Sequence, residues 1–226
     1  MYFDPMYYLF VLPALALVIV AQLMVRSAFS KYSKIPNLRG LTGAQAAYEV
    51  LHYNGVSSVT VFPCAGSLTD HYDPRTRRIM LSESVLNSRS VAAVGIAAHE
   101  AGHAVQHAKA YSPLKIRTAI IPACNIGSSL GIPLVFLGYW LQFAGLIWLG
   151  IALFSLAVLF QLVTLPVEFD ASRRALATIK SYGLLNANEQ AGAKRVLTAA
   201  AFTYVAALAQ SVMTLLYYIS RMNRRR

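Results

Sequence analysis

The sequence predicts a mainly α-helical integral membrane protein, with about four membrane helices and a small α+β region. Of its 226 residues, 57% are hydrophobic and only 13% are charged, whereas soluble domains carry about 25% charged residues. Several apolar runs reach the length of about 20 residues that a helix needs to cross a bilayer. Such a composition excludes a disordered chain and argues against an ordinary soluble enzyme.

The apolar runs define the expected membrane segments. Residues 6–24 predict a retained anchor, because no Lys or Arg precedes them and no small-residue cleavage site follows. Residues 118–165 contain no charged residue and are long enough for two passes, so we expect a helical hairpin that turns near Gln142 to Gly145. Residues 198–219 predict a fourth helix, either membrane-spanning or re-entrant.

Two polar segments, residues 28–117 and 166–197, complete the single domain expected over residues 1–226. Eleven basic residues lie between Arg26 and Arg117 and five lie in the second polar segment, while none precedes the anchor or interrupts the hairpin. Lys and Arg collect on the cytoplasmic side of membrane proteins. We therefore expect a multi-pass cell-membrane protein whose polar segments both face the cytoplasm.

Local signals predict the elements of these polar segments. Thr42 as a cap and Gly55 as a terminator predict a helix over residues 42–54, and Ser90 precedes a helical period over residues 91–108. The other expected elements are strands at 58–62 and 78–82, a turn at 70–74, and a helix at 168–182 closed by Gly183.

The sequence His99-Glu100-Ala101-Gly102-His103 is an H-E-x-x-H motif inside the expected helix at 91–108. Two histidines four residues apart face the same way on a helix, so their imidazoles can bind one zinc ion. Glu100 then lies where it can take a proton from water activated by the metal. Gly102 is expected to leave room beside the site. The plain alternative is a polar helix face that carries two surface histidines.

A catalytic zinc ion takes three protein ligands and keeps one position open, so a third ligand must come from elsewhere. The candidates are His52, His71, His107, Glu168 and Asp170. His107 lies one further turn along the helix, too far for a shared ion, and is expected to support the site from outside. Glu168 follows the hairpin, whose two ends lie close together, and a carboxylate at a membrane border needs a partner. Zinc would be such a partner; a helix cap or an ion pair with Arg173 or Arg174 is the alternative.

The motif at 99–103, the apolar hairpin and the segment Val167-Glu168-Phe169-Asp170-Ala171-Ser172-Arg173-Arg174 resemble the YugP-type membrane zinc metallopeptidases over nearly the whole chain. HtpX and the CAAX prenyl proteases are similar at a greater distance. The resemblance implies a gluzincin with one zinc ion per chain, held by His99, His103 and Glu168, with Glu100 as the general base. The HtpX pattern has an aspartate where this chain has Ser172, so the resemblance leaves open whether Asp170 or Ser172 supports the site and orients a ligand histidine.

The resemblance implies a membrane-embedded zinc endopeptidase that cleaves peptides or proteins, membrane proteins among them. By analogy with gluzincin folds, the strand at 79–82 is expected to be the sheet edge that docks an extended substrate. The candidate donors to the oxyanion are His71, Tyr72, His107 and Tyr182.

Two other classes of function stay open. One is a non-catalytic zinc-containing membrane scaffold or adaptor, against which the intact Glu100 argues. The other is a transporter or channel, against which the charge-free hairpin argues. Nucleic acid is not an expected partner, because the arginine-rich tail has no interleaved aromatic residues.

Overall fold

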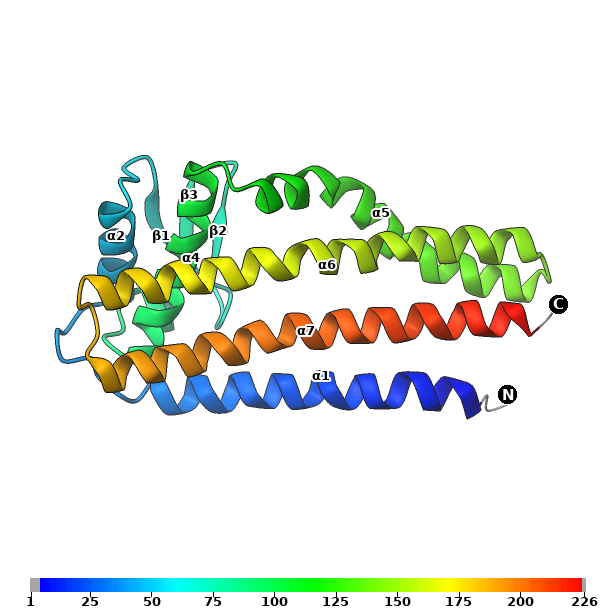
Figure 1. The fold of residues 1–226 in the computed structure, drawn as a ribbon, viewed down its shortest axis with the longest axis horizontal. Helices are drawn as coiled ribbons and strands as arrows, with labels where there is room; N and C mark the ends of the chain where they lie inside the picture. The colour runs from blue at the N-terminus through cyan, green and yellow to red at the C-terminus, as the bar shows by residue number, and fades with distance from the viewer. Residues whose placement is uncertain (1–4, 225–226) are drawn as a thin grey trace. The chain divides into compact units, whose positions relative to one another are not determined.

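The structure is a computed structural model that describes residues 5–224 of the chain. Over these residues (Figure 1) the elements are α1 (Pro5–Tyr32), α2 (Gly43–Tyr53), β1 (Thr60–Cys64), β2 (His71–Asp73), β3 (Arg78–Ser82), α3 (Glu83–Leu86), α4 (Val91–Ala108), α5 (Ser112–Trp140), α6 (Ala144–Ser181) and α7 (Ala187–Asn223). In this described part, four helices are long and apolar enough to cross a membrane, namely α1, α5, α6 and α7. The predicted fold class, a mainly helical membrane protein with a small α+β region, is therefore confirmed.

The chain divides into two compact units. The apolar unit contains Lys115–Leu165, the described N-terminal residues up to Gln22, and the described C-terminal residues from Phe202 onward. The polar unit contains Leu23–Leu114 and Pro166–Ala201. The residues that the sequence predicts to carry chemistry all lie in the polar unit.

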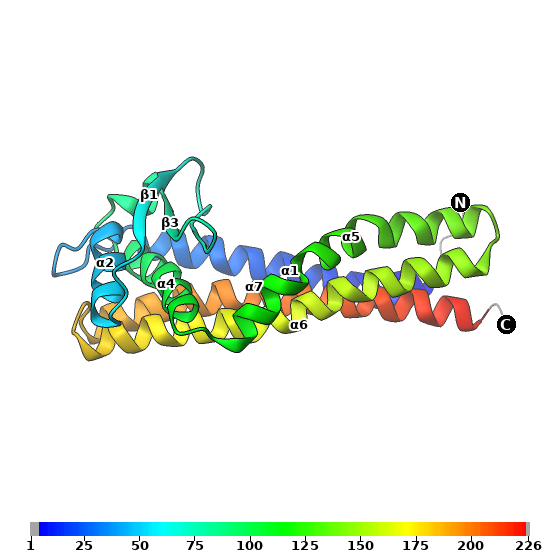
Figure 2. The same ribbon diagram turned by 90° about the horizontal axis from the view of Figure 1, so that it is seen from above.

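In the apolar unit, α5 and α6 form the expected hairpin, which both ribbon views show (Figures 1 and 2). Helix α5 ends at Trp140 and α6 begins at Ala144, so the chain turns where the sequence predicts. Gln142 in this turn has a φ of 52°, in the left-handed region. The two helices pack closely because Gly131 has no side chain: a Cβ there would lie 2.8 Å from the backbone nitrogen of Phe154.

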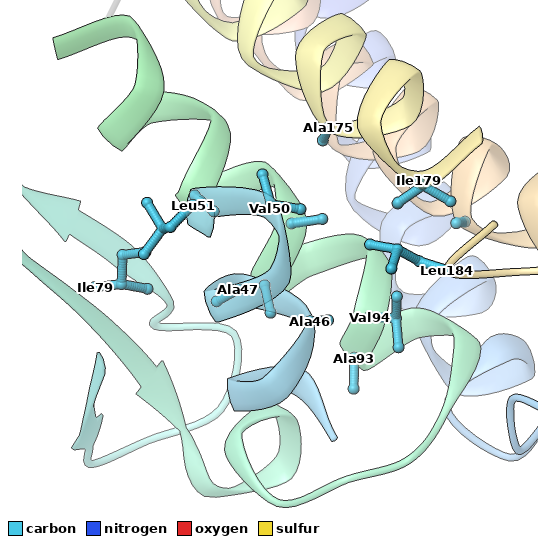
Figure 3. Close-up of a cluster of buried hydrophobic side chains, with 14 of the residues drawn as sticks. Ala46, Ala47, Val50, Leu51, Ile79, Ala93, Val94, Ala175, Ile179 and Leu184 are labelled. Carbon is cyan, nitrogen blue, oxygen red and sulfur yellow. The ribbon is translucent and has the colours of Figure 1, made fainter. Parts of the chain in front are cut away.

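The core of the polar unit forms around α4. Side chains of α2, β3, α4 and α6 meet in one buried cluster (Figure 3). Leu51 is 2% exposed, and Ile79 and Val94 are fully buried; burial of each such side chain contributes about 1.5–3 kcal/mol. Small alanines on α2 and α4 fill the space between these larger residues, so the helices pack closely and hold α4 firmly in place.

The helix ends predicted at Thr42, Gly55, Ser90 and Gly183 are confirmed. The Thr42 side chain accepts a hydrogen bond from the Gln45 backbone nitrogen while the Gln45 side chain accepts one from the Thr42 nitrogen, which is a complete capping box. The Ser90 side chain caps α4 by accepting from the Ala93 nitrogen. Gly55 and Gly183 have φ values of 70° and 59°, as a glycine that ends a helix should.

The sheet corrects two predictions about strands. Its order is β1-β3-β2, with β1 parallel and β2 antiparallel to β3. The prediction that 79–82 is a free edge is wrong, because β3 is the central strand. The segment expected as a turn at 70–74 contains β2, which pairs with β3 and covers that edge. Strand β1 starts later than predicted and continues through Pro63, which an edge strand tolerates.

The long helices extend past the limits that the sequence predicts. Pro166 lies inside α6, so the separate helix expected to start at 168 is instead part of one continuous helix. A proline removes one helical hydrogen bond, and long apolar helices tolerate this. Helix α7 begins at Ala187, well before the predicted 198, because Asn186 and Glu189 cap each other's backbone nitrogens. It runs unbroken to Asn223.

Candidate metal centre

Helices α4 and α6 bring three metal-ligating side chains together. His99 and His103 lie one turn apart on α4, and their ring centroids are 4.7 Å apart. Glu168 of α6 faces both rings: its Oε2 lies 3.3 Å from His99 Nε2 and 3.5 Å from His103 Nε2. One ligand atom from each residue lies within 4.8 Å of the other two. The chain thus places Glu168, rather than the other candidates for a third ligand, beside the two histidines.

The three side chains fit a zinc ion. Imidazole nitrogens and a carboxylate oxygen are ordinary zinc ligands. His103 and Glu168 are 9% and 3% exposed, and burying a carboxylate is costly unless a positive partner compensates its charge. A divalent cation between the three groups would supply that compensation and would use every ligand atom that converges there.

The approach of α6 to α4 depends on Gly102. The sequence suggested that this glycine leaves room beside the site, but the structure corrects that interpretation. The backbone of α6 at Ala171 occupies the space where the Gly102 side chain would be. The glycine therefore lets the helix that carries Glu168 pack directly against the helix that carries the histidines.

Each histidine also has a partner at its second ring nitrogen. His99 Nδ1 lies 3.0 Å from Ser172 Oγ, and His103 Nδ1 lies 3.0 Å from Gln106 Oε1. Ser172 was a predicted supporting residue, whereas Gln106 was missed by the sequence analysis. A signal was present, since Gln106 follows His103 by three residues and so lies on the same side of the helix.

Asp170 supports the centre indirectly. Its carboxylate accepts hydrogen bonds from Arg173, Arg174 and the Gln106 amide. The alternative reading, in which the arginines pair with Glu168, is therefore not the arrangement seen. Asp170 is connected to His103 through the Gln106 side chain. The position of Asp170 in the sequence therefore does not show by itself how His103 is oriented.

The charges around His103 favour its protonated form when no metal is bound. Burial lowers the pKa of His103, but the hydrogen bond to Glu168 and the negative charges of Glu100 and Glu168 outweigh burial, so the pKa lies above its ordinary value of 6.5. Glu100 itself is 8% exposed. The negative charge that raises this pKa is also what attracts a cation to the site.

Tyr72 and His107 form a separate pair. The Tyr72 hydroxyl lies 2.7 Å from His107 Nδ1. Both side chains line a pocket of about 280 Å³, to which Arg77 and Ala104 also contribute. His107 therefore does not join the three ligating residues, in agreement with the distance argued from helix geometry.

The remaining sequence candidates make contacts elsewhere. His71 Nδ1 lies 2.8 Å from the carbonyl oxygen of Thr69. Tyr182 stacks on Tyr53 with ring centroids 3.6 Å apart, and His52 packs edge-on against the same tyrosine. None of these three side chains belongs to the group formed by His99, His103 and Glu168.

Comparison with known proteins agrees with the centre. A family model described as "Putative neutral zinc metallopeptidase" matches residues 7–223. The "Putative membrane protease YugP" of Bacillus subtilis (strain 168) is 49% identical over 207 residues, which cover 91% of this chain and 92% of that protein. No solved structure matches the chain. The predicted resemblance is thus confirmed, and the chain belongs to the family described as "putative neutral zinc metallopeptidase".

Proposed function

We propose that the protein is a membrane-embedded zinc-dependent endopeptidase in which His99, His103 and Glu168 hold one zinc ion. The observation that carries this proposal is the convergence of three ligand atoms, from two helices, within 4.8 Å of one another. The family description and the name of the Bacillus relative support a zinc peptidase at a membrane.

The partners of neighbouring side chains favour a catalytic centre over a structural one. A structural zinc site closes its shell with four protein ligands, whereas a catalytic site keeps one position open. Two candidates for a fourth ligand have other partners, since His107 contacts Tyr72 and Asp170 contacts Gln106 and the arginines. A three-ligand centre argues against the non-catalytic scaffold.

Hydrolysis of a peptide bond assigns a role to each residue. Bound zinc supplies the Lewis acidity that makes water a nucleophile near neutral pH and polarises the peptide carbonyl. Glu100 accepts the proton that the attacking water loses as the new C–O bond forms. Glu100 then gives this proton to the leaving amine nitrogen as the C–N bond breaks. His99 and His103 stay neutral to serve as ligands.

The location of the reaction follows from charge and sequence position. The polar unit contains nine of the eleven basic residues between Arg26 and Arg117 and all five of the second polar segment, while the hairpin at 118–165 contains no charge at all. Because the cytoplasmic loops of membrane proteins are enriched in Lys and Arg, we place the centre at the cytoplasmic face of the cell membrane. Glu168 stands three residues after the apolar run ends at Leu165. Peptide or protein substrates, including membrane proteins, would then be cleaved beside the bilayer.

The test is to purify the full chain in detergent, measure its zinc content and assay cleavage of casein or a fluorogenic peptide. We expect Glu100→Gln to keep its zinc and lose cleavage, because the amide cannot accept the proton. Glu83→Gln is the matched control, since Glu83 is exposed on α3. Unchanged cleavage by Glu100→Gln would rule out this mechanism.

A further inference from the structure

Gln106 is a fully buried polar residue whose amide orientation is set by its neighbours. Its side chain approaches the carbonyl oxygen of Val167 at 2.8 Å and Asp170 Oδ2 at 2.9 Å. Both of these oxygens can only accept a hydrogen bond. The group facing them must therefore be the Gln106 Nε2 amide nitrogen, which has two hydrogens to donate.

This orientation determines which nitrogen of His103 carries a proton. With Nε2 directed at α6, the Gln106 oxygen faces His103 Nδ1 at 3.0 Å. A carbonyl oxygen accepts but cannot donate, so Nδ1 must hold the hydrogen. In the neutral ring, Nε2 then has a free lone pair, and this is the atom that faces Glu168.

We propose, resting on the zinc centre proposed above, that Gln106 is a positioning residue: it fixes His103 in the tautomer whose Nε2 binds the metal. The orientation is enforced through Asp170, which holds the amide and is itself held by Arg173 and Arg174. The same amide joins α4 to the backbone of α6 next to Glu168. One side chain thus connects the ligand ring on α4 with the helix that carries Glu168.

The other ligand lacks such a constraint. His99 Nδ1 contacts the hydroxyl of Ser172, which can either donate or accept a hydrogen bond. Ser172 is therefore compatible with both tautomers of His99. We expect Ser172→Ala to weaken zinc binding less than a loss of the Gln106 amide does.

The experiment compares two substitutions in the full chain in detergent. Gln106→Leu removes the acceptor for His103 Nδ1 and should weaken zinc binding about 10- to 100-fold, as loss of a hydrogen-bond partner to a ligand histidine does. Gln106→Glu keeps an oxygen facing Nδ1 but loses both amide donors. If the tautomer is what matters, Gln106→Glu binds zinc with an affinity closer to the wild type than to Gln106→Leu. Gln106→Met replaces the leucine variant should the latter fail to fold.

Three readouts separate positioning from general stability: zinc affinity by competition with a chromophoric chelator, the visible spectrum of the Co²⁺-substituted protein, and the melting temperature of the metal-free protein. The matched control is Thr178→Val, which removes the hydrogen bond from Asn54 Nδ2 to Thr178 Oγ1, a partly buried contact of α6. We expect the control to change the melting temperature but neither the zinc affinity nor the Co²⁺ spectrum.

A purely structural role for Gln106 predicts the opposite ranking. Gln106→Glu would then be the weaker zinc binder, because it cuts both contacts to α6 and adds a charge beside Asp170. That ranking, or a leucine variant that binds zinc as tightly as Thr178→Val, overturns the proposal. Absence of cleavage by the zinc-loaded wild type would instead contradict the proposed function, and it leaves the affinity comparison intact.

Discussion

Gly102 of α4 lies against Ala171 of α6 so closely that a Cβ added to the glycine would be 2.6 Å from the Ala171 carbonyl oxygen. No real Cβ is tolerated at that distance from backbone, so the two helices would have to separate. His103 follows Gly102 directly in the chain and Glu168 precedes Ala171 by one turn. The contact between these two backbones therefore controls the distance between the metal ligands.

We expect Gly102→Ala to lower both stability and zinc affinity. Alanine favours a helix over glycine by about 1 kcal/mol, but overpacking of this kind costs about 1–3 kcal/mol. Thermal unfolding and chelator competition measure the two effects. Gly43→Ala is the control, because its Cβ would lie 2.2 Å from the Val85 carbonyl oxygen. This clash is as severe as the one at Gly102, but it involves none of the metal ligands. Equal loss of zinc affinity in both variants would contradict this account.

Removal of zinc should destabilise the polar unit. In the proposed centre, ligands from α4 and α6 share the ion, so folding and metal binding would be coupled, and an ion at 100 times its Kd contributes about 2.7 kcal/mol. We expect a chelator to lower the melting temperature of the wild type. The Glu168→Gln variant should melt at nearly the same temperature with or without chelator. A wild type that does not respond to the chelator would argue against a shared ion.

The raised pKa of His103 predicts opposite pH responses with and without metal. Zinc binds the neutral ring, so protons compete with it, and zinc affinity should fall as the pH drops, beginning above the ordinary histidine pKa of 6.5. In the metal-free protein, the raised pKa stabilises the fold below 6.5, and this stabilisation disappears as the pH rises through the folded-state pKa. Melting curves across this range, with zinc and with chelator, give both trends. His103→Asn should lose most of the zinc affinity and remove this pH-dependent stabilisation from the metal-free protein.

The pair Tyr72 and His107 should be dispensable for metal binding. We expect Tyr72→Phe and His107→Asn to keep the zinc content of the wild type, because neither side chain belongs to the three-residue group. His99→Asn, which removes a ligand, should lose most of it. Elemental analysis of the purified variants measures this. Loss of zinc in His107→Asn comparable to that in His99→Asn would indicate a fourth ligand and favour the structural scaffold.

The sequence was most informative where local chemistry decides the outcome. Thr42 and Ser90 cap their helices as predicted, because a side-chain oxygen beside free backbone nitrogens acts whatever the rest of the fold does. The turn near Gln142 was also located, since the apolar run is long enough for two passes and contains a short interruption. The family resemblance pointed to Glu168, which the structure places beside both histidines.

The features that the sequence did not reveal depend on tertiary contacts. Strand β2 has only three residues and forms by pairing with β3, so the segment reads locally as a turn. The sequence predicts a separate helix from residue 168, although α6 continues through Pro166. Gln106 carries no charge and matches no motif, and its importance comes from Val167 and Asp170, which lie about 60 positions later in the chain.

The α4–α6 interface alone supplies all the side chains described at the centre. Helix α4 provides the stretch from His99 to Gln106, and α6 provides the stretch from Glu168 to Ser172. Separation of these two helices would therefore take apart the proposed metal site while leaving each helix intact. In the proposed enzyme, activity would then depend on the contact between α4 and α6 as much as on the ligands themselves.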